Sequence, residues 1–188
     1  YTTLFRSYLR EFDYMVFPDN ASIGLAVAEA LGIDAETAMR GMLNAQPDPG
    51  AMRITTFGDE KNPAFLVNGF AANDASSTLR IWERVDSMNY SEKLPIVIMN
   101  CRPDRVDRTE QFAEDVMPYI EADIMIAIGQ TTSPIAAAYQ RGELPTKEFW
   151  DMEGASTEEI LERMKPYLKD RIVYGVGNIH GSAEPLVE

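Results

Sequence analysis

Four short apolar segments after residue 60 are each followed directly by a polar segment rich in glycine, asparagine, arginine or serine. The apolar segments span residues 64–70, 95–101, 123–129 and 171–176, and the polar segments are AAND, RPDRVDR, QTTSP and GNIHG. The stretches between them have helical patterns, and such alternation of strands and helices is typical of a doubly wound, mainly parallel sheet. The carboxyl ends of parallel strands meet at one edge, where open α/β sheets bind ligands. The sequence therefore predicts a binding site at that edge.

The first 45 residues have a helical pattern of their own. A helix over residues 22–31 is expected to end at Gly32, and Asp34 is placed to cap a second helix over residues 35–44. The segment QPDPG interrupts this pattern and is the best domain boundary in the chain. We therefore expect a helical segment over residues 1–49 and an α/β domain over residues 50–188, which opens with a strand at 52–57 and a turn at 58–63.

The helices of the α/β domain follow its strands. We expect them near residues 75–88, 108–119, 134–141 and 157–168. A polar residue that can cap the helix stands at or near the start of each: Asp74, Asp107 with Glu110, Ser133 before Pro134, and Ser156 with Glu159.

The composition excludes several classes of function. A net charge of −13 argues against nucleic acid as a partner, because phosphate binding needs a basic face. One cysteine, Cys101, allows no internal disulfide, and its place at the end of an apolar strand indicates a packed thiol. With one histidine and no pair of cysteines, we expect no metal site built by this chain. No apolar stretch is long enough to span a bilayer.

The segment RPDRVDR places Arg102, Arg105 and Arg108 in one short loop of an acidic protein. Guanidinium groups bind carboxylates and phosphates at two points, so the loop suits an anionic substrate. Asp104 and Asp107 nearly balance this charge, and a surface ion-pair cluster is the alternative. We favour a binding role for the arginines and a helix-capping role for Asp107.

The segment GNIHG contains His180, the sole histidine of the chain. Any imidazole chemistry that this chain supplies must therefore use His180. Gly175, Gly177 and Gly181 allow the backbone to turn tightly or to approach a ligand. A turn with a hydrogen-bonded histidine explains the pattern equally well.

Three further residues are candidates for contact with a ligand. Asn73 stands between a strand and a helix, Asn20 stands near the start of the first long helix, and Arg53 follows the Pro/Gly break. For Asn20, helix capping and ligand binding are equally natural, Asn73 could hydrogen-bond a ligand, and for Arg53 a surface position is the simpler account. No Walker A sequence occurs in the chain, so it cannot build a P-loop by itself.

Five long segments resemble the ligase subunit of poly-γ-glutamate synthase, the PgsB/CapB type. They are FPDNASIGLAVAEALGID, NAQPDPGAMRI, FLVNGFAANDASSTLRIW, IMNCRPDRVDRTEQFAEDV and IVYGVGNIHGSAEPLVE. The likeness extends from about Tyr8 to Glu188, whereas the opening residues 1–7 do not fit and look like a scar. This family is similar to the Mur ligases, which have a central ATPase domain followed by a Rossmann-like domain.

The resemblance implies a fold and a reaction. Residues 1–49 would be the helical tail of the central ATP-binding domain, and residues 50–188 a Rossmann-like C-terminal domain with helices on both faces of its sheet. ATP and Mg²⁺, bound mainly by the central domain, would convert the chain-end carboxylate to an acyl phosphate, which the amine of the next glutamate attacks. The implied partners are glutamate, the poly-γ-glutamate chain and membrane subunits at the cytoplasmic face of a bacterial membrane. Whether the protein is a homo-oligomer stays open.

The resemblance also implies roles for individual residues. In the RPDRVDR loop, Asp104, Arg105 and Arg108 match a Mur loop, and Arg102 joins them as a candidate catalytic residue together with His180. Candidate nucleotide contacts match less completely: Asn20 and Asn73 are kept from Mur motifs that have otherwise changed, and Arg53 stands near a Mur arginine position that is Ala51 here.

The expectation for the isolated chain is the absence of ligase activity, since the P-loop and the central-domain groups would lie outside it. The alternative interpretation is a non-catalytic, Rossmann-like module that binds an anion or docks onto a membrane synthase complex.

Overall fold

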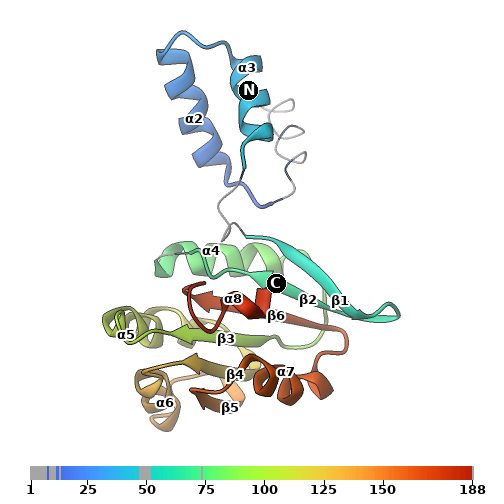
Figure 1. The fold of residues 1–188 in the computed structure, drawn as a ribbon, viewed down its shortest axis with the longest axis vertical. Helices are drawn as coiled ribbons and strands as arrows, with labels where there is room; N and C mark the ends of the chain where they lie inside the picture. Colours follow the sequence, from blue (N-terminus) through green and yellow to red (C-terminus); the bar gives the residue numbers. More distant parts are fainter. Residues whose placement is uncertain (1–7, 9–11, 13, 47–51, 73, 188) are drawn as a thin grey trace. The chain divides into compact units, whose positions relative to one another are not determined.

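The computed structural model describes residues 8, 12, 14–46, 52–72 and 74–187. The chain divides after Arg53 into two compact units, Tyr1–Arg53 and Ile54–Glu188. Figure 1 shows the helical elements of the first and the sheet of the second. Each unit is described by itself below.

The first unit contains two described helices, α2 (Pro18–Ala30) and α3 (Ala35–Asn44). Helix α2 begins before residue 22, because Pro18 at its first position has a backbone already suited to a helix. Gly32 follows this helix with φ +78°, a conformation that favours glycine. The predicted cap of α3 is confirmed: Asp34 Oδ1 accepts a hydrogen bond from Thr37 N at 2.9 Å.

The second unit is built on a six-stranded sheet in the order β1-β2-β6-β3-β4-β5. Strands β1 and β2 form an antiparallel hairpin, and the other pairs are parallel. The bounds are β1 (Ile54–Asp59), β2 (Asn62–Asn68), β3 (Ile96–Cys101), β4 (Ala122–Gly129), β5 (Thr146–Glu153) and β6 (Arg171–Gly177). The four predicted parallel strands are thus confirmed, with ends shifted by one or two residues, while the predicted turn at 58–63 is mostly strand.

Strand β5 was not predicted. Its sequence, TKEFWDME, has charged residues at four of its positions, and only Trp150 and Met152 are buried. This pattern suits its place at the edge of the sheet, where it pairs with β4 alone. The aromatic pair Phe149–Trp150 after Pro145 was the available signal for a strand.

Helices cover both faces of the sheet, as predicted. The chain moves from β2 through β3 and β4 to β5 in one direction, so right-handed crossovers place α4 (Ala75–Asp86), α5 (Val106–Asp115) and α6 (Ser133–Gln140) on one face. The return from β5 to β6 places α7 (Thr157–Met164) on the opposite face. The short elements η1 (Met117–Tyr119), η2 (Lys165–Tyr167) and α8 (Glu184–Val187) complete the unit. Among the described residues, no helix has the length and apolar character needed to cross a bilayer.

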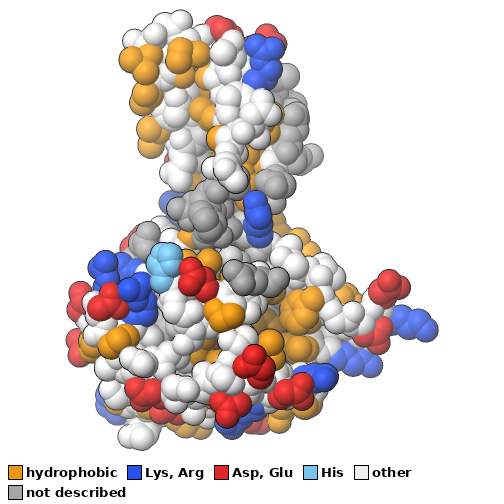
Figure 2. Space-filling view, viewed as in Figure 1, with side chains coloured by type: hydrophobic (Ala, Val, Ile, Leu, Met, Phe, Trp, Pro, Cys, Tyr) orange, Lys and Arg blue, Asp and Glu red, His pale blue; other side chains and the backbone are white. Residues whose placement is uncertain are grey.

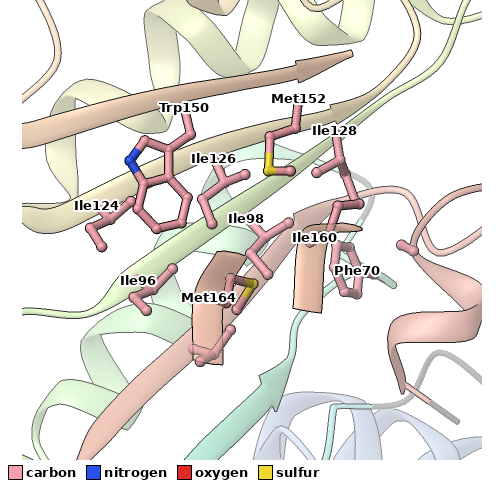
Figure 3. Close-up of a cluster of buried hydrophobic side chains, with 12 residues drawn as sticks. Phe70, Ile96, Ile98, Ile124, Ile126, Ile128, Trp150, Met152, Ile160 and Met164 are labelled. Atoms are coloured by element: carbon pink, nitrogen blue, oxygen red, sulfur yellow. The ribbon is translucent and has the colours of Figure 1, made fainter. Parts of the chain in front are cut away.

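The main core lies between the sheet and α7. Alternate residues of β3 and β4 point to this face and pack with Trp150 and Met152 of β5 and with Ile160 and Met164 of α7 (Figure 3). On the other face, Tyr174 of β6 stacks against Trp82 of α4, with ring centroids 5.5 Å apart. Both faces of the parallel strands are therefore buried, which explains why these strands are apolar runs rather than alternating sequences.

The helix caps were predicted with mixed success. Asp74 caps α4 by accepting a hydrogen bond from Ser77 N at 2.8 Å, and Ser156 with Glu159 forms the capping box of α7. Two predictions were wrong. The N-cap of α6 is Thr132, one residue before Ser133. The N-cap of α5 is Arg105, because a turn places Asp107 inside the first turn of that helix.

Candidate functional site

A crevice is expected at the carboxyl edge of the sheet between the neighbouring strands β3 and β6. The chain leaves β3 for α5 on one face, whereas after β6 it packs Ile179 and Ala183 into the core cluster on the opposite face. Loops that diverge in this way open the place where α/β sheets bind ligands. The segments RPDRVDR and GNIHG follow these two strands, so the structure places them side by side.

Arg102 is the residue that connects the two segments. Its Nε donates to Asp104 Oδ1 at 2.9 Å and its Nη2 to Asp104 Oδ2 at 2.7 Å, while Nη1 donates to Asn178 Oδ1 at 3.2 Å. The guanidinium group holds the pKa of Asp104 below its usual value. With 27% of its side chain exposed, Arg102 has a fixed orientation and still faces solvent.

His180 lies in the turn after β6. Its backbone N–H donates to Asn178 Oδ1 at 2.9 Å, and its Nδ1 lies 3.2 Å from Glu184 Oε1. The side chain is 67% exposed. In Figure 2, the single histidine side chain stands at the surface with basic and acidic side chains gathered beside it. The imidazole is thus available to a ligand, on the same edge as Arg102.

Asn100 lies beneath this turn. It is 2% exposed, and its Nδ2 donates to the carbonyl oxygens of Asn178 and His180, at 3.0 Å for the latter. Its Oδ1 is buried and has no hydrogen-bond partner within the described part of the chain. An unsatisfied buried acceptor costs about 1–3 kcal/mol. Close packing is possible because Gly177 has φ +100° and no side chain, since a Cβ there would lie 2.6 Å from Asn100 O.

Arg105 and Arg108 stand at the start of α5. Arg105 is the exposed N-cap residue, and Arg108 is half-buried in the first turn. Together with Arg102 they place three guanidinium groups on one segment at the carboxyl edge. This arrangement suits an anionic ligand, and the individual roles of Arg102, Asp104, Arg105, Arg108 and His180 stay predictions.

The three candidate nucleotide contacts stay predictions. Asn20 lies in the first turn of α2, and Arg53 ends the first unit. Asn73 lies outside the described residues. Asp74, which follows it, acts as the cap of α4, and its hydrogen bonds from Ser77 lower its pKa.

A second polar cluster lies at the ends of β4 and β5. The Oγ1 of Thr132 lies 2.8 Å from Asp151 Oδ1 and 3.2 Å from Glu153 Oε2, and Thr131 N donates to Glu153 Oε1 at 2.6 Å. Thr131 has φ +64°, which is unusual for a β-branched residue. These bonds tie the QTTSP segment to the edge strand, so that Thr132 serves β5 instead of capping α6 with its side chain.

Two further findings concern the thiol of Cys101 and groups of side chains that could hold a metal ion. Burial raises the pKa of the Cys101 thiol to about 12, which agrees with the predicted packed thiol. Among the described residues, no group of three or more histidine, cysteine, aspartate or glutamate side chains is placed to hold a metal ion.

Sequence reasoning missed Asn100, Asn178 and Glu184. Asn100 had a usable signal, because it is the polar residue in the apolar strand IVIMNC, and a buried amide needs hydrogen-bond partners. Asn178 belongs to the quoted GNIHG segment, but nothing in the sequence indicates that its side chain meets Arg102. Glu184 lies four residues after His180, a spacing that brings side chains together once a helical turn forms.

The fold and the two polar segments at its carboxyl edge define an α/β domain of the kind found in ligand-binding doubly wound proteins. The chain belongs to the family described as the poly-gamma-glutamate synthase CapB C-terminal domain, which matches residues 54–188. It is 74% identical over 181 residues to the capsule biosynthesis protein CapB of Bacillus anthracis, covering 96% of this chain and 39% of that protein. It is 62% identical over 181 residues to the PGA synthase CapB of Bacillus subtilis (strain 168), covering 96% and 46%. The chain therefore spans less than half the length of these relatives.

Two solved structures of similar fold are named as ligases. The structure of UDP-N-acetylmuramoylalanyl-D-glutamyl-2,6-diaminopimelate--D-alanyl-D-alanyl ligase from Acinetobacter baumannii matches with a TM-score of 0.56 at 19% identity, covering 89% of this chain and 34% of that one. The murein peptide ligase Mpl from Psychrobacter arcticus 273-4 matches with a TM-score of 0.59 at 13% identity, covering 92% and 36%. At such identities the likeness shows the fold, and it confirms the predicted Mur ligase-like α/β architecture.

Proposed function

We propose that this chain is the C-terminal portion of an ATP-dependent amide ligase that polymerises glutamate through its γ-carboxylate, in the synthesis of a poly-γ-glutamate capsule. Membership of the CapB C-terminal domain family and the names of two relatives support this proposal. We further propose that the helices of the first unit, α2 and α3, are the tail of the central ATP-binding domain, whose remainder lies in the longer protein.

The observation that carries the proposal is the bond between Arg102 Nη1 and Asn178 Oδ1. It fixes a guanidinium group at the carboxyl edge of the sheet, on the same segment as Arg105 and Arg108. The substrate of the proposed reaction is a chain of carboxylates, and guanidinium groups recognise carboxylates through paired hydrogen bonds. A protein with net charge −13 repels such a polyanion elsewhere, so a local basic segment is needed to bind it.

The reaction assigns a limited task to this chain. ATP, as co-substrate, supplies the phosphoryl group that activates the chain-end carboxylate. The amine nitrogen of the incoming glutamate then forms the C–N bond as the acyl C–O bond breaks, phosphate leaves and the amine loses a proton. The arginines of the RPDRVDR segment bind carboxylates of the polymer or of the incoming glutamate. His180 presents an exposed imidazole to the same carboxylates. No step of the proposal passes through a metal ion held by this chain.

The proposal extends to partners and location. Glutamate and the growing poly-γ-glutamate chain would be the substrates, and the membrane subunits of the synthase would be protein partners at the cytoplasmic face of the bacterial membrane. ATP and Mg²⁺ would be bound mainly by the central domain.

The test is an assay of the full-length parent protein with ATP, Mg²⁺ and glutamate, measuring ADP release and polymer length. We expect ADP release that depends on glutamate, and a loss of at least about tenfold in kcat/KM in Arg102→Ala, as for removal of a charged group that binds substrate. Arg141→Ala is the matched control, because Arg141 forms the same two-point pair with Glu143 after α6, away from the carboxyl edge.

A parent protein that releases no ADP in response to glutamate would contradict the proposal. Titration of the isolated chain with glutamate, oligo-γ-glutamate and ATP then separates the remaining alternatives. Binding of one of these anions would favour a non-catalytic binding module, and binding of none would favour a docking module.

A further inference from the structure

Asn100 is the polar member of a strand whose six residues are all buried. Strand β3 lies between β6 and β4, so a side chain near its carboxyl end stands between the segments that follow those two strands. Side chains alternate along a strand, which places Asn100 on the same face as Ile96 and Ile98. The question is why an amide occupies a position where its neighbours are isoleucines.

The Nδ2 atom of Asn100 makes two hydrogen bonds to one turn. It donates to the carbonyl oxygens of Asn178 and His180, 78 and 80 residues further along the chain. Because both partners are carbonyl oxygens, only the NH₂ end of the amide can face them. The turn is therefore held at two backbone atoms, on either side of Ile179.

The turn, fixed in this way, orients two candidate site residues, His180 and Arg102. Asn178 Oδ1 accepts hydrogen bonds from His180 N at 2.9 Å and from Arg102 Nη1 at 3.2 Å. Two asparagines, Asn100 and Asn178, thus connect the buried strand to the partly exposed guanidinium group of Arg102. Within this path, a shift of the Asn178 backbone would move the acceptor that fixes Arg102.

The oxygen end of the Asn100 amide is not stabilised by a hydrogen bond. Oδ1 is buried without a hydrogen-bond partner in the described part of the chain, and it faces Gly129, where a Cβ would lie 2.9 Å from it. A buried acceptor without a partner lowers stability. Residues that break a local rule in this way are expected where a functional site requires them.

We propose that Asn100 is a positioning residue for the candidate site: it fixes the turn at residues 178–180, and through Asn178 it sets the orientation of Arg102. It does not contact substrate. The nature of the ligand rests on the proposed function, whereas the positioning itself does not.

The test compares Asn100→Val with Ile98→Val in the isotopically labelled 188-residue chain. Ile98→Val removes one methylene from the same face of the same strand and leaves the turn untouched, so it is the matched control. The readout is hydrogen exchange of the His180 amide, which is donated to Asn178 Oδ1. We expect exchange at least tenfold faster in Asn100→Val than in wild type, a shifted Arg102 Nε–H signal, and a thermal midpoint no lower than that of Ile98→Val.

Asn100→Ser provides a second variant if valine prevents folding, because its hydroxyl can donate one of the two hydrogen bonds. In Asn100→Ser the His180 amide should exchange at a rate between those of wild type and Asn100→Val. If Asn100→Val does not fold, the exchange in Asn100→Ser should still be faster than in wild type. The proposal would be overturned if the His180 amide exchanged at the wild-type rate in the Asn100 variants. It would also be overturned if Ile98→Val accelerated this exchange as much as Asn100→Val does.

Kinetics of the full-length protein give a separate readout. In Asn100→Val we expect the KM for oligo-γ-glutamate to rise at least fivefold, with a smaller change in kcat and no change in Ile98→Val. If the wild-type protein makes no polymer, the proposed function fails, and the exchange measurement still decides whether Asn100 positions the turn. If wild type is active and Asn100→Val retains both kinetic constants, the positioning role is refuted.

Discussion

Arg102 Nη1 lies 3.2 Å from Asn178 Oδ1, and this bond joins two segments that are 76 residues apart in the sequence. The contact is possible because β3 and β6 are neighbours, with Asn100 paired to Gly177 in register. Each residue that follows these strands therefore emerges at the same height on the carboxyl edge. The bond joins the two loops into one candidate site, and it gives Arg102 Nη1 a hydrogen-bond partner within the protein.

The first prediction concerns Arg102→Lys, which keeps the charge and removes the planar fork. Arg102 uses all three nitrogens, two toward Asp104 and one toward Asn178, and a lysine ammonium cannot reproduce these directions. We expect the affinity of the isolated chain for oligo-γ-glutamate, measured by calorimetry, to fall about tenfold in Arg102→Lys. This corresponds to a loss of about 1.4 kcal/mol of binding free energy.

Arg141→Lys is the control for this prediction. Arg141 makes the same paired bonds to Glu143, at 2.7 Å each, away from the carboxyl edge. Its replacement should leave the affinity unchanged. Equal affinities of wild type and Arg102→Lys would show that charge alone, without orientation, accounts for binding.

The second prediction concerns Gly175→Ala in β6. A Cβ at Gly175 would lie 2.2 Å from Phe70 Cε2, and a Cβ at Gly69 would lie 2.4 Å from Tyr174 Cε2, so each ring occupies the space beside a glycine of the neighbouring segment. Overpacking of this kind costs about 1–3 kcal/mol, sometimes more. Urea unfolding should show this loss of unfolding free energy.

Gly41→Ala, in helix α3, is the contrasting substitution. Nothing lies within 4 Å of a Cβ there, and alanine in a helix interior is expected to stabilise by about 0.5–1 kcal/mol. Combining Gly175→Ala with Phe70→Leu should recover part of the loss, because the smaller side chain makes room. A Gly175→Ala protein as stable as wild type would show that Phe70 moves aside freely.

The third prediction concerns acid stability through Asp123. Hydrogen bonds from Lys147 and Arg171 lower its pKa, the former at 2.7 Å, while partial burial opposes this effect. A lowered folded pKa contributes stability above the ordinary value of 3.8, and this stability is lost as the pH falls below it toward the folded pKa. We expect Asp123→Asn to be less stable than wild type at pH 7, by about 1–3 kcal/mol, and to lose less stability on acidification.

Urea midpoints between neutral pH and pH about 3 test this prediction, since the transition lies below the reference pKa of aspartate. Glu143→Gln, which removes the exposed carboxylate paired with Arg141, should change the neutral-pH midpoint little. Parallel pH profiles for wild type and Asp123→Asn would mean that other carboxylates control the acid transition.

The fourth prediction concerns Cys101. Burial raises the pKa of its thiol to about 12, so the thiolate, which is the reactive form, is scarce near neutral pH. A thiol reagent should leave the native chain unmodified and should modify one thiol per chain in concentrated guanidinium chloride. Rapid modification of the native chain would contradict the packed position of Cys101.

The strands of the parallel sheet could be predicted because burial on both faces leaves a simple signal. Residues 95–101 and 123–129 are apolar runs, and both faces of these strands are covered by helices in the structure. Asp34, Asp74 and Ser156 could also be predicted as caps, because capping depends on bonds to residues three positions away.

The errors occur where distant residues decide local structure. Thr132, and not Ser133, is the N-cap of α6, and its side-chain hydroxyl is hydrogen-bonded to Asp151 and Glu153, which belong to a strand that was not predicted. Asp107 lies inside α5 because the turn after β3 begins that helix at Val106. Neither the hydrogen bonds of Thr132 nor the position at which α5 begins can be recognised from the few residues around it in the sequence.

The amino-acid sequence alone determined the alternation of elements, and with it the edge of the sheet to which RPDRVDR and GNIHG belong. Strand direction is fixed by short connections and the handedness of crossovers, and both are local properties. Only the tertiary structure decided that β6 inserts next to β3, that Asn100 reaches the turn after β6, and that Asn178 meets Arg102. Strand order depends on which buried faces pack best across the whole domain, and no segment encodes that comparison by itself.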